Sequence, residues 1–473
     1  MKQKLFILVT WLLCVTAWRC SGQTPVTITF DTNRTGAAIS PWFSGLSFET
    51  QMELPMTNGE YYFRASNKPL VKLFQTLGIK NLRVGGNTAD RATIGVPGEA
   101  DIDSLFAFAE AAGVKVIYTF RLNNGDPKRE GQLAKYIMGR YKANLACFEI
   151  GNEPNVYAKE YPVYREEWKN YMAAITAPDA APDAKFCGPS ATAARRSWAV
   201  NFAEDFGHTD KVVAATQHEY PGGAAGKATN LIAAQDRLLS PQLLKNYEKA
   251  YLSYAPTVIS NGLAIRIEEA NSFYNGGARG VSDTLASALW SLDYMYWWAQ
   301  HGAEGINFHT GDRVAIGKGM GSPGYASFTT SAGGYLVHPI GYGIKMFDFG
   351  GHGKMLPVEV HTNAGEINLT AYASMANDGV VCLTILNKEH GRGALAAEVS
   401  IGKSGVFGSA QVIYLKSSNG DVGATTGVTI GGAMIKDDGS WSGDWKYLKP
   451  SSDGEFSVML PPASAVVVKL VPR

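Results

Sequence analysis

The feature of this chain that most constrains its fold is a regular alternation of short apolar runs with helical patterns between residues 40 and 345. Leu70–Leu77 and Leu285–Trp298, for example, carry apolar side chains at the three- and four-residue spacing of a core-packing helix. Strand-then-helix units of this kind indicate an α/β fold, and eight of them in about 300 residues indicate a (β/α)8 TIM barrel. The expected strands are Gly45–Glu49, Ile79–Gly85, Val114–Phe120, Leu145–Gly151, Lys185–Pro189, Val212–His218, Leu263–Glu269 and Gly305–His309.

A doubly wound parallel sheet is the alternative architecture for such a pattern. That fold would place a glycine-rich phosphate-binding loop after its first strand. The segment Val84-Gly85-Gly86-Asn87 does not have the G-x-G-x-x-G spacing of that loop. The barrel is therefore the expected fold of residues 39–348.

The pattern changes after about residue 350, where alternating apolar and polar residues are separated by turns rich in Gly, Ser, Asn and Asp. This pattern predicts a C-terminal antiparallel β-sandwich over residues 349–473. Val26–Asp31 alternates in the same way, so residues 23–38 are expected to add an N-terminal strand to the sandwich. The expected sandwich strands are Glu366–Ala373, Gly379–Asn387, Ala396–Ile401, Ala410–Tyr414 and Ser464–Val471.

Residues 1–22 have the pattern of a secretory signal peptide. A basic start precedes Leu5–Trp18, an apolar run that is too short for a comfortable membrane span. A lipid anchor at Cys20 is disfavoured because Arg19, directly before it, is neither small nor neutral. We therefore expect a secreted or periplasmic protein without a membrane partner once the signal is cleaved.

Charge and metal-binding patterns exclude several classes of function. The chain has 43 Lys and Arg against 42 Asp and Glu with no charged block, so a nucleic-acid partner is not expected. The eight histidines form no H-E-x-x-H motif, and Cys147, Cys187 and Cys382 lack metal-binding spacing. We expect these cysteines to be buried core thiols and the mechanism to use no metal and no cofactor. The oligomeric state is not predicted.

Two predicted strands end in glutamates, at the barrel end where functional residues gather. Glu149, Gly151 and Glu153 alternate toward the barrel axis, where carboxylates are costly to bury unless a site uses them. The structural alternative is a solvated helix start, with Asn152 as its cap and Pro154 at the first helical position.

The seventh predicted strand ends in Glu268-Glu269, and its end lies across the barrel mouth from that of the fourth. Two carboxyl groups about 5 Å apart suit a retaining glycosidase, whereas a wider gap implies inversion. If Ile265 and Ile267 face the helices, alternation points Glu268 rather than Glu269 into the barrel. Barrel interiors also accept Ile, so the alternation leaves both glutamates open.

The segments Asn152-Glu153-Pro154-Asn155 and Glu269-Ala270-Asn271-Ser272 resemble glycoside hydrolase family 79, the β-glucuronidases and heparanases of a retaining clan with a (β/α)8 barrel. The resemblance covers nearly the whole mature chain. It implies that Glu153 is the general acid/base, Glu269 the nucleophile and Asn152 a donor to the sugar 2-hydroxyl. Glu268 is the fallback nucleophile. The chemistry needs one protonated carboxyl for the leaving oxygen and one ionised carboxyl for the anomeric carbon.

His218-Glu219-Tyr220 resembles the His-x-Tyr segment of this family, in which the tyrosine hydrogen-bonds the nucleophile. Arg83 resembles an arginine on the second strand that neighbours the nucleophile. Ordinary core packing is the alternative for His218 and Tyr220, and a buried ion pair is compatible with the functional role of Arg83.

The same resemblance implies how a glucuronide is bound. Tyr274 and Gly276 match, by their offset from the nucleophile, a tyrosine hydroxyl and a backbone amide that contact the sugar carboxylate. Glu49 and Asp90 resemble acidic residues near the outer hydroxyls, and Tyr325 is a further candidate for the pocket. A plain glycine-rich turn is the alternative for the segment around Gly276.

Two departures from the family pattern bear on the substrate. Asn87-Thr88 stands where heparanases carry other residues, and the chain lacks clustered basic residues for a sulfated polymer. Both favour an exo-acting microbial type of β-glucuronidase over an endo-acting, heparanase-like enzyme. A clan relative acting on a neutral sugar and a non-catalytic carbohydrate-binding protein are the remaining alternatives.

Overall fold

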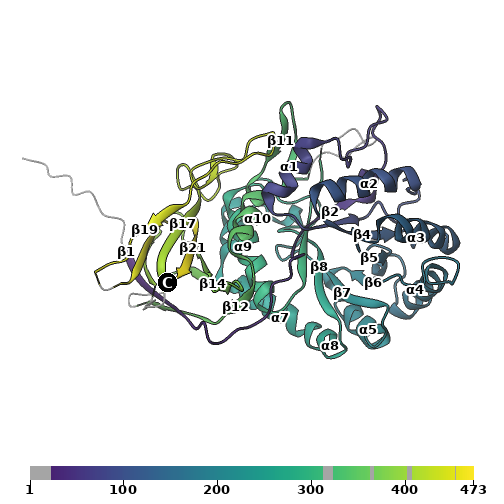
Figure 1. Cartoon of the computed structure of the whole chain (residues 1–473), viewed down its shortest axis with the longest axis horizontal. Coiled ribbons are helices and arrows are strands. Elements are labelled where there is room, and N and C mark those ends of the chain that lie inside the picture. The colour runs from purple at the N-terminus through teal and green to yellow at the C-terminus, as the bar shows by residue number, and fades with distance from the viewer. Residues whose placement is uncertain (1–22, 313–322, 363–366, 402–406, 453) are drawn as a thin grey trace, which may run out of the picture.

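The computed structural model describes residues 23–312, 323–362, 367–401, 407–452 and 454–473. The predicted signal peptide lies outside these residues. Within them, no helix combines the length and apolar character needed to cross a bilayer. Figure 1 shows a barrel ringed by helices on one side and a layered β-structure, containing the C-terminus, on the other.

The barrel is closed by eight parallel strands, which confirms the predicted fold and is incompatible with an open doubly wound sheet. Each predicted strand is present, with ends shifted by at most two residues. The strands are β2 (Ser44–Glu49), β3 (Asn81–Gly85), β4 (Lys115–Phe120), β5 (Leu145–Ile150), β6 (Phe186–Ala191), β7 (Val212–Glu219), β8 (Ala264–Ala270) and β9 (Gly305–His309).

Helices follow most of these strands and cover the outside of the barrel. Helix α1 begins with Pro69 in its first turn and ends at Gly78, whose φ of 73° provides the left-handed cap. The helices are α1 (Lys68–Leu77), α2 (Glu99–Ala112), α3 (Pro127–Tyr141), α4 (Tyr161–Ile175), α5 (Ser197–Phe206), α6 (Leu231–Leu239), α7 (Pro241–Leu252), α8 (Ala255–Ser260), α9 (Leu285–Gln300) and α10 (Pro339–Gly350). Short 3-10 helices are η1 (Thr50–Glu53), η2 (Pro154–Val156), η3 (Ala193–Arg195) and η4 (Ala225–Lys227).

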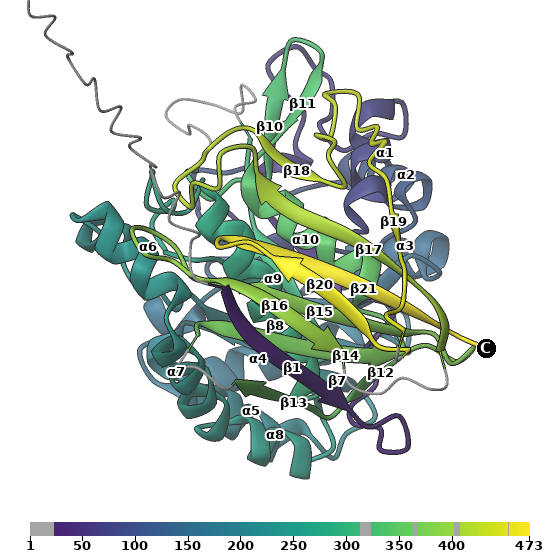
Figure 2. The same ribbon diagram turned by 90° about the vertical axis from the view of Figure 1, so that its left-hand side faces the viewer.

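The second part is a sandwich of two sheets, as Figure 2 shows face-on. One sheet has the order β13-β1-β16-β20, and the other β12-β14-β15-β21-β17-β18 with β19 beside β17. Their strands are β1 (Gln23–Phe30), β12 (Lys354–Leu356), β13 (Val358–Thr362), β14 (Leu369–Met375), β15 (Val381–Asn387), β16 (Ala396–Ile401), β17 (Phe407–Ser417), β18 (Val428–Ile430), β19 (Lys446–Leu448), β20 (Phe456–Leu460) and β21 (Ser464–Pro472).

The N-terminal strand joins the sandwich, as predicted. Strand β1 pairs antiparallel with β13 but parallel with β16, so the sandwich is not purely antiparallel. The pairing buries Val26 and Ile28, the alternating apolar residues from which the strand was predicted. The short strands β12, β13, β18, β19 and β20, and the hairpin β10 (Phe328–Ser331)–β11 (Gly334–Val337), were not predicted from the pattern.

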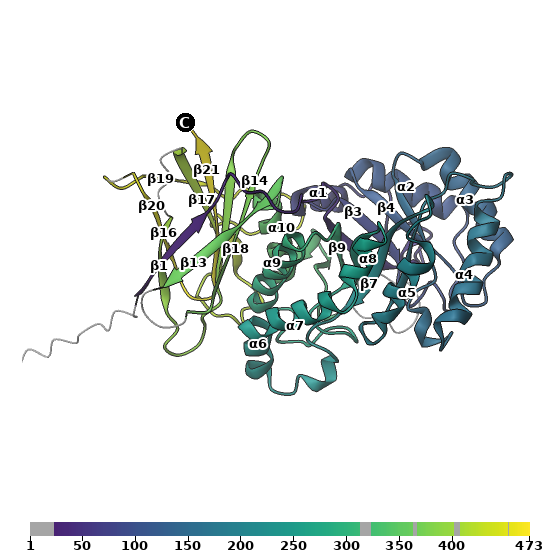
Figure 3. The same cartoon turned by 90° about the horizontal axis from the view of Figure 1, so that it is seen from below.

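Helices α9 and α10 lie between barrel and sandwich, as Figure 3 shows. Helix α9 is therefore buried on all sides from Leu285 to Ala299. Its Asp293 accepts hydrogen bonds of 2.8 Å from Thr370 and Tyr372 and an ion pair of 2.8 Å from Lys388, all three from the sandwich. The buried, ion-paired carboxylate of Asp293 thus connects the sandwich to helix α9 of the barrel.

The three cysteines of the described chain are free thiols. Cys147 and Cys187 are buried, as predicted, whereas Cys382 is only half-buried.

Candidate active site

A cavity of about 470 Å³ opens at the carboxyl ends of the barrel strands. Residues from seven strand ends or the loops after them converge on it, and three of these residues are glutamates. The lining residues are Glu49, Asn87, Glu153, Thr192, Ala193, Ala194, His218, Tyr220, Glu269, Tyr274, Asn275, Gly276, His309 and Tyr325. The predicted strand-end residues therefore meet at one site.

A bulge in β8 decides how its two glutamates are directed. Gln217 of β7 pairs with Ile267, but the next residue, His218, pairs with Glu269, so Glu268 is an extra residue in β8. A β-bulge of this kind breaks the alternation of side chains. Both glutamates consequently lie inside the barrel: Glu269 lines the cavity, and Glu268 is fully buried 3.8 Å from His218 Nε2.

Glu153 lies beyond the end of β5, on the turn into η2. Its φ of 45° and ψ of 49° are left-handed, a conformation that costs a non-glycine residue of order 1–3 kcal/mol. Its N–H donates to Ser190 O at 3.0 Å, and Pro154 starts the short helix as expected, but the cap position is Glu153 itself rather than Asn152. A helix start and a carboxylate directed into the cavity thus coexist at the same turn.

The carboxylates of Glu153 and Glu269 face each other across His218. One oxygen of each, together with a ring nitrogen of His218, lies within 4.8 Å of the others. His218 Nδ1 is 3.0 Å from Glu153 Oε1 and 3.8 Å from Glu269 Oε1. The two carboxyl groups are therefore close enough to act on one glycosidic bond from opposite sides.

Glu269 is held as a carboxylate by its surroundings. Tyr220 donates to its Oε1 at 2.8 Å, and Arg83 Nη1 lies 2.7 Å from its Oε2. Burial alone would raise the pKa of Glu269, but His309, His218, Arg83 and the Tyr220 hydroxyl hold it well below its ordinary value. An ionised carboxylate of this kind is suited to nucleophilic attack.

Arg83 organises the floor of the site without lining the cavity. Its guanidinium makes two 2.9 Å hydrogen bonds to Glu149 and a 2.8 Å hydrogen bond to Asn152 Oδ1. This geometry explains the second inward glutamate of β5: Glu149 balances the buried Arg83. The hydrogen bond from Arg83 to Oδ1 fixes the side chain of Asn152. Its Nδ2 lies 3.4 Å from Oδ1 of Asn87, a residue of the cavity wall.

His218 is buried among carboxylates. Burial would lower its pKa, but Glu269, Glu153 and Glu268 outweigh that effect and raise the pKa to about 10. Two groups, Glu149–His218–Glu268 and Glu153–His218–Glu269, have the spacing of a metal-binding cluster. A protonated imidazole offers no lone pair to a metal, whereas both of its N–H groups can donate to the carboxylates around it.

Of the residues predicted to bind the sugar, Glu49, Tyr220, Tyr274, Gly276 and Tyr325 line the cavity. Asn152 and Asp90 do not, and Asn152 reaches only the wall residue Asn87. The Asp90 carboxylate accepts hydrogen bonds from the N–H groups of Leu122, Asn123 and Asn152 and from the Tyr157 hydroxyl, at 2.7–3.0 Å. These four donors occupy its oxygens, so Asp90 supports the turn before Glu153 and does not line the cavity.

His309, at the end of β9, was not among the predicted site residues. Its Nε2 lies 3.5 Å from Glu49 Oε1 and its Nδ1 lies 3.7 Å from Glu269 Oε2. Burial would lower the pKa of His309, but Glu269 and Glu49 raise it. Its position at the end of the eighth strand was the available signal, because strand ends of a barrel surround its active site.

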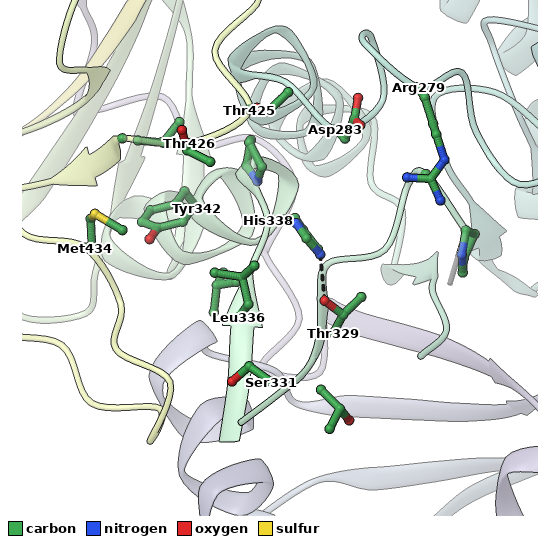
Figure 4. Close-up of a pocket in the computed structure, with 17 residues that line it drawn as sticks. Arg279, Asp283, Thr329, Ser331, Leu336, His338, Tyr342, Thr425, Thr426 and Met434 are labelled. Carbon is green, nitrogen blue, oxygen red and sulfur yellow. Dashed lines mark hydrogen bonds between the residues drawn. The ribbon is translucent and has the colours of Figure 1, made fainter. Parts of the chain in front are cut away.

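Figure 4 shows a second cavity, of about 440 Å³. It neighbours the first, because Gly324 of its lining donates a hydrogen bond to Gly276 of the first cavity. It is bounded by the loop after β8, the β10–β11 hairpin, the start of α10 and the sandwich loop 425–428. His338 Nε2 lies 3.0 Å from the Thr329 hydroxyl, and Asp283 is the one carboxylate among the described lining residues. Because the opposed carboxylates face the first cavity, that cavity is the candidate active site.

Known proteins resemble this chain in sequence and in fold. No protein-family model matches the chain. A β-glucuronidase from Aspergillus niger is 24% identical over 389 residues, which cover 68% of this chain and 66% of that protein. A β-glucuronidase from Neurospora crassa is 25% identical over 293 residues, covering 49% of this chain and 50% of that protein. The alignments thus span less than two thirds of these relatives.

Solved structures show the same architecture. A 4-O-α-L-rhamnosyl-β-D-glucuronidase from Fusarium oxysporum matches with a TM-score of 0.69 and 18% identity, covering 95% of this chain and all of that one. A family 51 arabinofuranosidase from Xanthomonas axonopodis pv. citri matches with a TM-score of 0.66 and 15% identity, again over 95% and 100%. The chain therefore has the barrel-and-sandwich fold of glycoside hydrolases. In sequence it is similar to β-glucuronidases.

Proposed function

We propose that the protein is a retaining glycoside hydrolase that removes β-linked glucuronic acid, and that it belongs to glycoside hydrolase family 79. The observation that carries the proposal is the opposed pair of Glu153 and Glu269, with oxygens within 4.8 Å, in one cavity of a (β/α)8 barrel. Glu269 attacks the anomeric carbon while Glu153 protonates the glycosidic oxygen. Glu153 then removes a proton from the water that cleaves the glycosyl-enzyme.

The loop after β8 supports an anionic sugar. Asn275, Gly276 and Gly277 have φ values of 61°, 82° and 78°, three consecutive left-handed residues. Among the hydrogen bonds of the described residues, none has the N–H of any of these three as its donor. Free backbone N–H groups at a cavity wall suit a carboxylate. Tyr274, 43% exposed beside them, offers a hydroxyl to the same group.

The cavity also has polar groups that suit a ring with many hydroxyls. Glu49 is fixed by hydrogen bonds of 2.7 and 2.6 Å from the N–H and hydroxyl of Thr88 and faces His309. Its carboxylate and the imidazole provide an acceptor and a donor for vicinal hydroxyls. The signal-like residues 1–22 support secretion or a periplasmic location.

The proposal is tested with aryl β-glucuronide, β-glucoside, β-xyloside and α-arabinofuranoside at equal concentration. We expect hydrolysis of the glucuronide to exceed the others, and NMR of the first product to show β-glucuronic acid. Preference for a neutral glycoside would refute the substrate, and initial α-anomer would refute retention. Binding of glucuronides without turnover would instead indicate a carbohydrate-binding protein.

A further inference from the structure

Glu268 is a buried carboxylate that the proposed double displacement does not use. It is fully buried by the bulge of β8. Its Oε2 lies 3.8 Å from the Cys187 thiol, and no described residue hydrogen-bonds its Oε1. The cation nearest to it is His218, whose Nε2 lies 3.8 Å from Oε1 and likewise has no hydrogen-bond partner among the described residues.

The pairing of the neighbouring charges leaves His218 as the counterion of Glu268. Glu149 and Glu269 are both paired with Arg83, at 2.9 and 2.7 Å. An unpaired carboxylate in a protein interior is strongly destabilising. Among the described residues, His218 is the basic side chain within 4 Å of Glu268, and the other ring nitrogen of His218 faces Glu153 at 3.0 Å.

We propose that Glu268 is a positioning residue for the acid/base: it orients and charges His218, which in turn directs the carboxyl group of Glu153. The inference rests on the proposed function, because it assigns Glu153 its role. In the series Glu268–His218–Glu153, Glu268 has the role of the buried carboxylate of a serine hydrolase. That carboxylate orients the histidine ring and stabilises its cation.

The proton balance of the two half-reactions is simple. In the first, the Glu153 proton moves to the glycosidic oxygen, the C1–O bond breaks with its electrons on that oxygen, and Glu269 bonds to C1. The ionised Glu153 then accepts a hydrogen bond from His218 Nδ1–H while Nε2–H faces Glu268. In the second, water bonds to C1, its proton passes to Glu153 and Glu269 leaves. His218 and Glu268 are unchanged.

The first test is the substitution Glu268→Gln, which keeps the volume and removes the charge. Two β-glucuronides are compared: 2,4-dinitrophenyl, whose leaving group needs no proton, and methyl, whose leaving group does. We expect kcat/KM to fall about tenfold or more on the methyl glycoside and to stay near wild type on the dinitrophenyl one. Glu268→Asp, which retains the charge, should recover part of the lost rate, whereas Glu269→Gln should abolish both reactions.

The matched control is Glu219→Gln. Glu219 is a buried carboxylate next to His218 in sequence, but it pairs with Arg196 at 2.6 and 2.5 Å. This variant should not change the ratio of the two rates. Equal losses on both substrates in Glu268→Gln, or no loss on either, would overturn the proposal.

A second readout does not depend on activity. The protonation of His218 is followed by NMR of 15N-labelled histidine rings, and its signal is identified by its absence in His218→Asn. We expect its midpoint to fall by about one to three pH units in Glu268→Gln. An unchanged midpoint overturns the proposal whatever the kinetics show. If the wild type cleaves no glycoside, the proposed function fails, and the midpoint alone then decides whether Glu268 charges His218.

Discussion

The hydroxyl of Tyr220 lies 2.8 Å from Oε1 of Glu269 and donates a hydrogen bond to it. Tyr220 follows the end of β7 and Glu269 lies near the end of the neighbouring strand β8, so the barrel itself sets their distance. The bond leaves the carboxylate fixed and accessible from the cavity. Two neighbouring strands thus together fix the position of the proposed nucleophile, Glu269.

Substitution of Tyr220 by Phe should lower kcat/KM on an aryl β-glucuronide by about 10- to 100-fold, because a hydrogen bond to a charged group contributes about 1.5–3 kcal/mol. Removal of this donor also raises the pKa of Glu269, so the acidic limb of the pH–rate profile should move to higher pH. Tyr254→Phe is the matched control, since that buried hydroxyl has no hydrogen-bond partner among the described residues. An unshifted acidic limb would contradict the role of Tyr220.

Substitution of Glu153 by Ala should abolish turnover of poor leaving groups but spare the first step for 2,4-dinitrophenyl glucuronide. Added azide should then restore turnover and give a glycosyl azide, because a small anion enters the space of the missing carboxylate and needs no general base. Glu160→Ala, an exposed glutamate of the same loop, should respond to azide no more than wild type does. Failure of azide to restore turnover would remove Glu153 from the acid/base role.

The barrel could be predicted because each of its strands is a short apolar run and the helices between them show clear periodicity. Glu153 and Glu269 could be placed at one rim because strand ends of a closed barrel surround a common mouth. The three-residue strands β12, β18 and β19 carry too few residues for an alternation to be recognised.

Two features of the site could not be predicted from sequence patterns. The bulge at Glu268 changes the alternation by one residue, and it is visible only from the pairing with Gln217 and His218 on the neighbouring strand. Asp90 has the residue type and loop position of a sugar ligand, yet backbone N–H groups from two other loops occupy its oxygens. Hydrogen-bond partners from distant loops leave no pattern in the sequence around Asp90.

The correction for Asp90 can be tested by Asp90→Asn. Because Oδ2 accepts from the Asn152 N–H at 2.7 Å and from Tyr157, an amide at this position leaves buried groups unpaired. The free energy of unfolding in urea should fall by about 1–3 kcal/mol, and kcat should fall as the turn before Glu153 loses its support. A rise in KM with unchanged stability would instead show that Asp90 contacts the sugar.

The pH dependence of stability should report Glu130, a residue of α3 that is 1% exposed. Burial raises the pKa of Glu130 from 4.5 to about 7, against the opposing effect of Arg129 and Arg121. Between these two pH values the folded protein binds a proton that the unfolded chain has released. The free energy of unfolding therefore decreases as the pH rises through this range, by about 3 kcal/mol in all, and the loss is complete above about pH 7.

Glu130→Gln removes this titration, so urea denaturation at pH 5 and pH 8 should show a smaller decrease in the variant than in wild type. The comparison cancels the contributions of all other groups. Glu110→Gln, an exposed glutamate of α2, controls for the change in net charge. If wild type and Glu130→Gln lose the same stability between the two pH values, Glu130 is ionised in the folded protein, and Arg129, 3.4 Å away, outweighs the cost of burial.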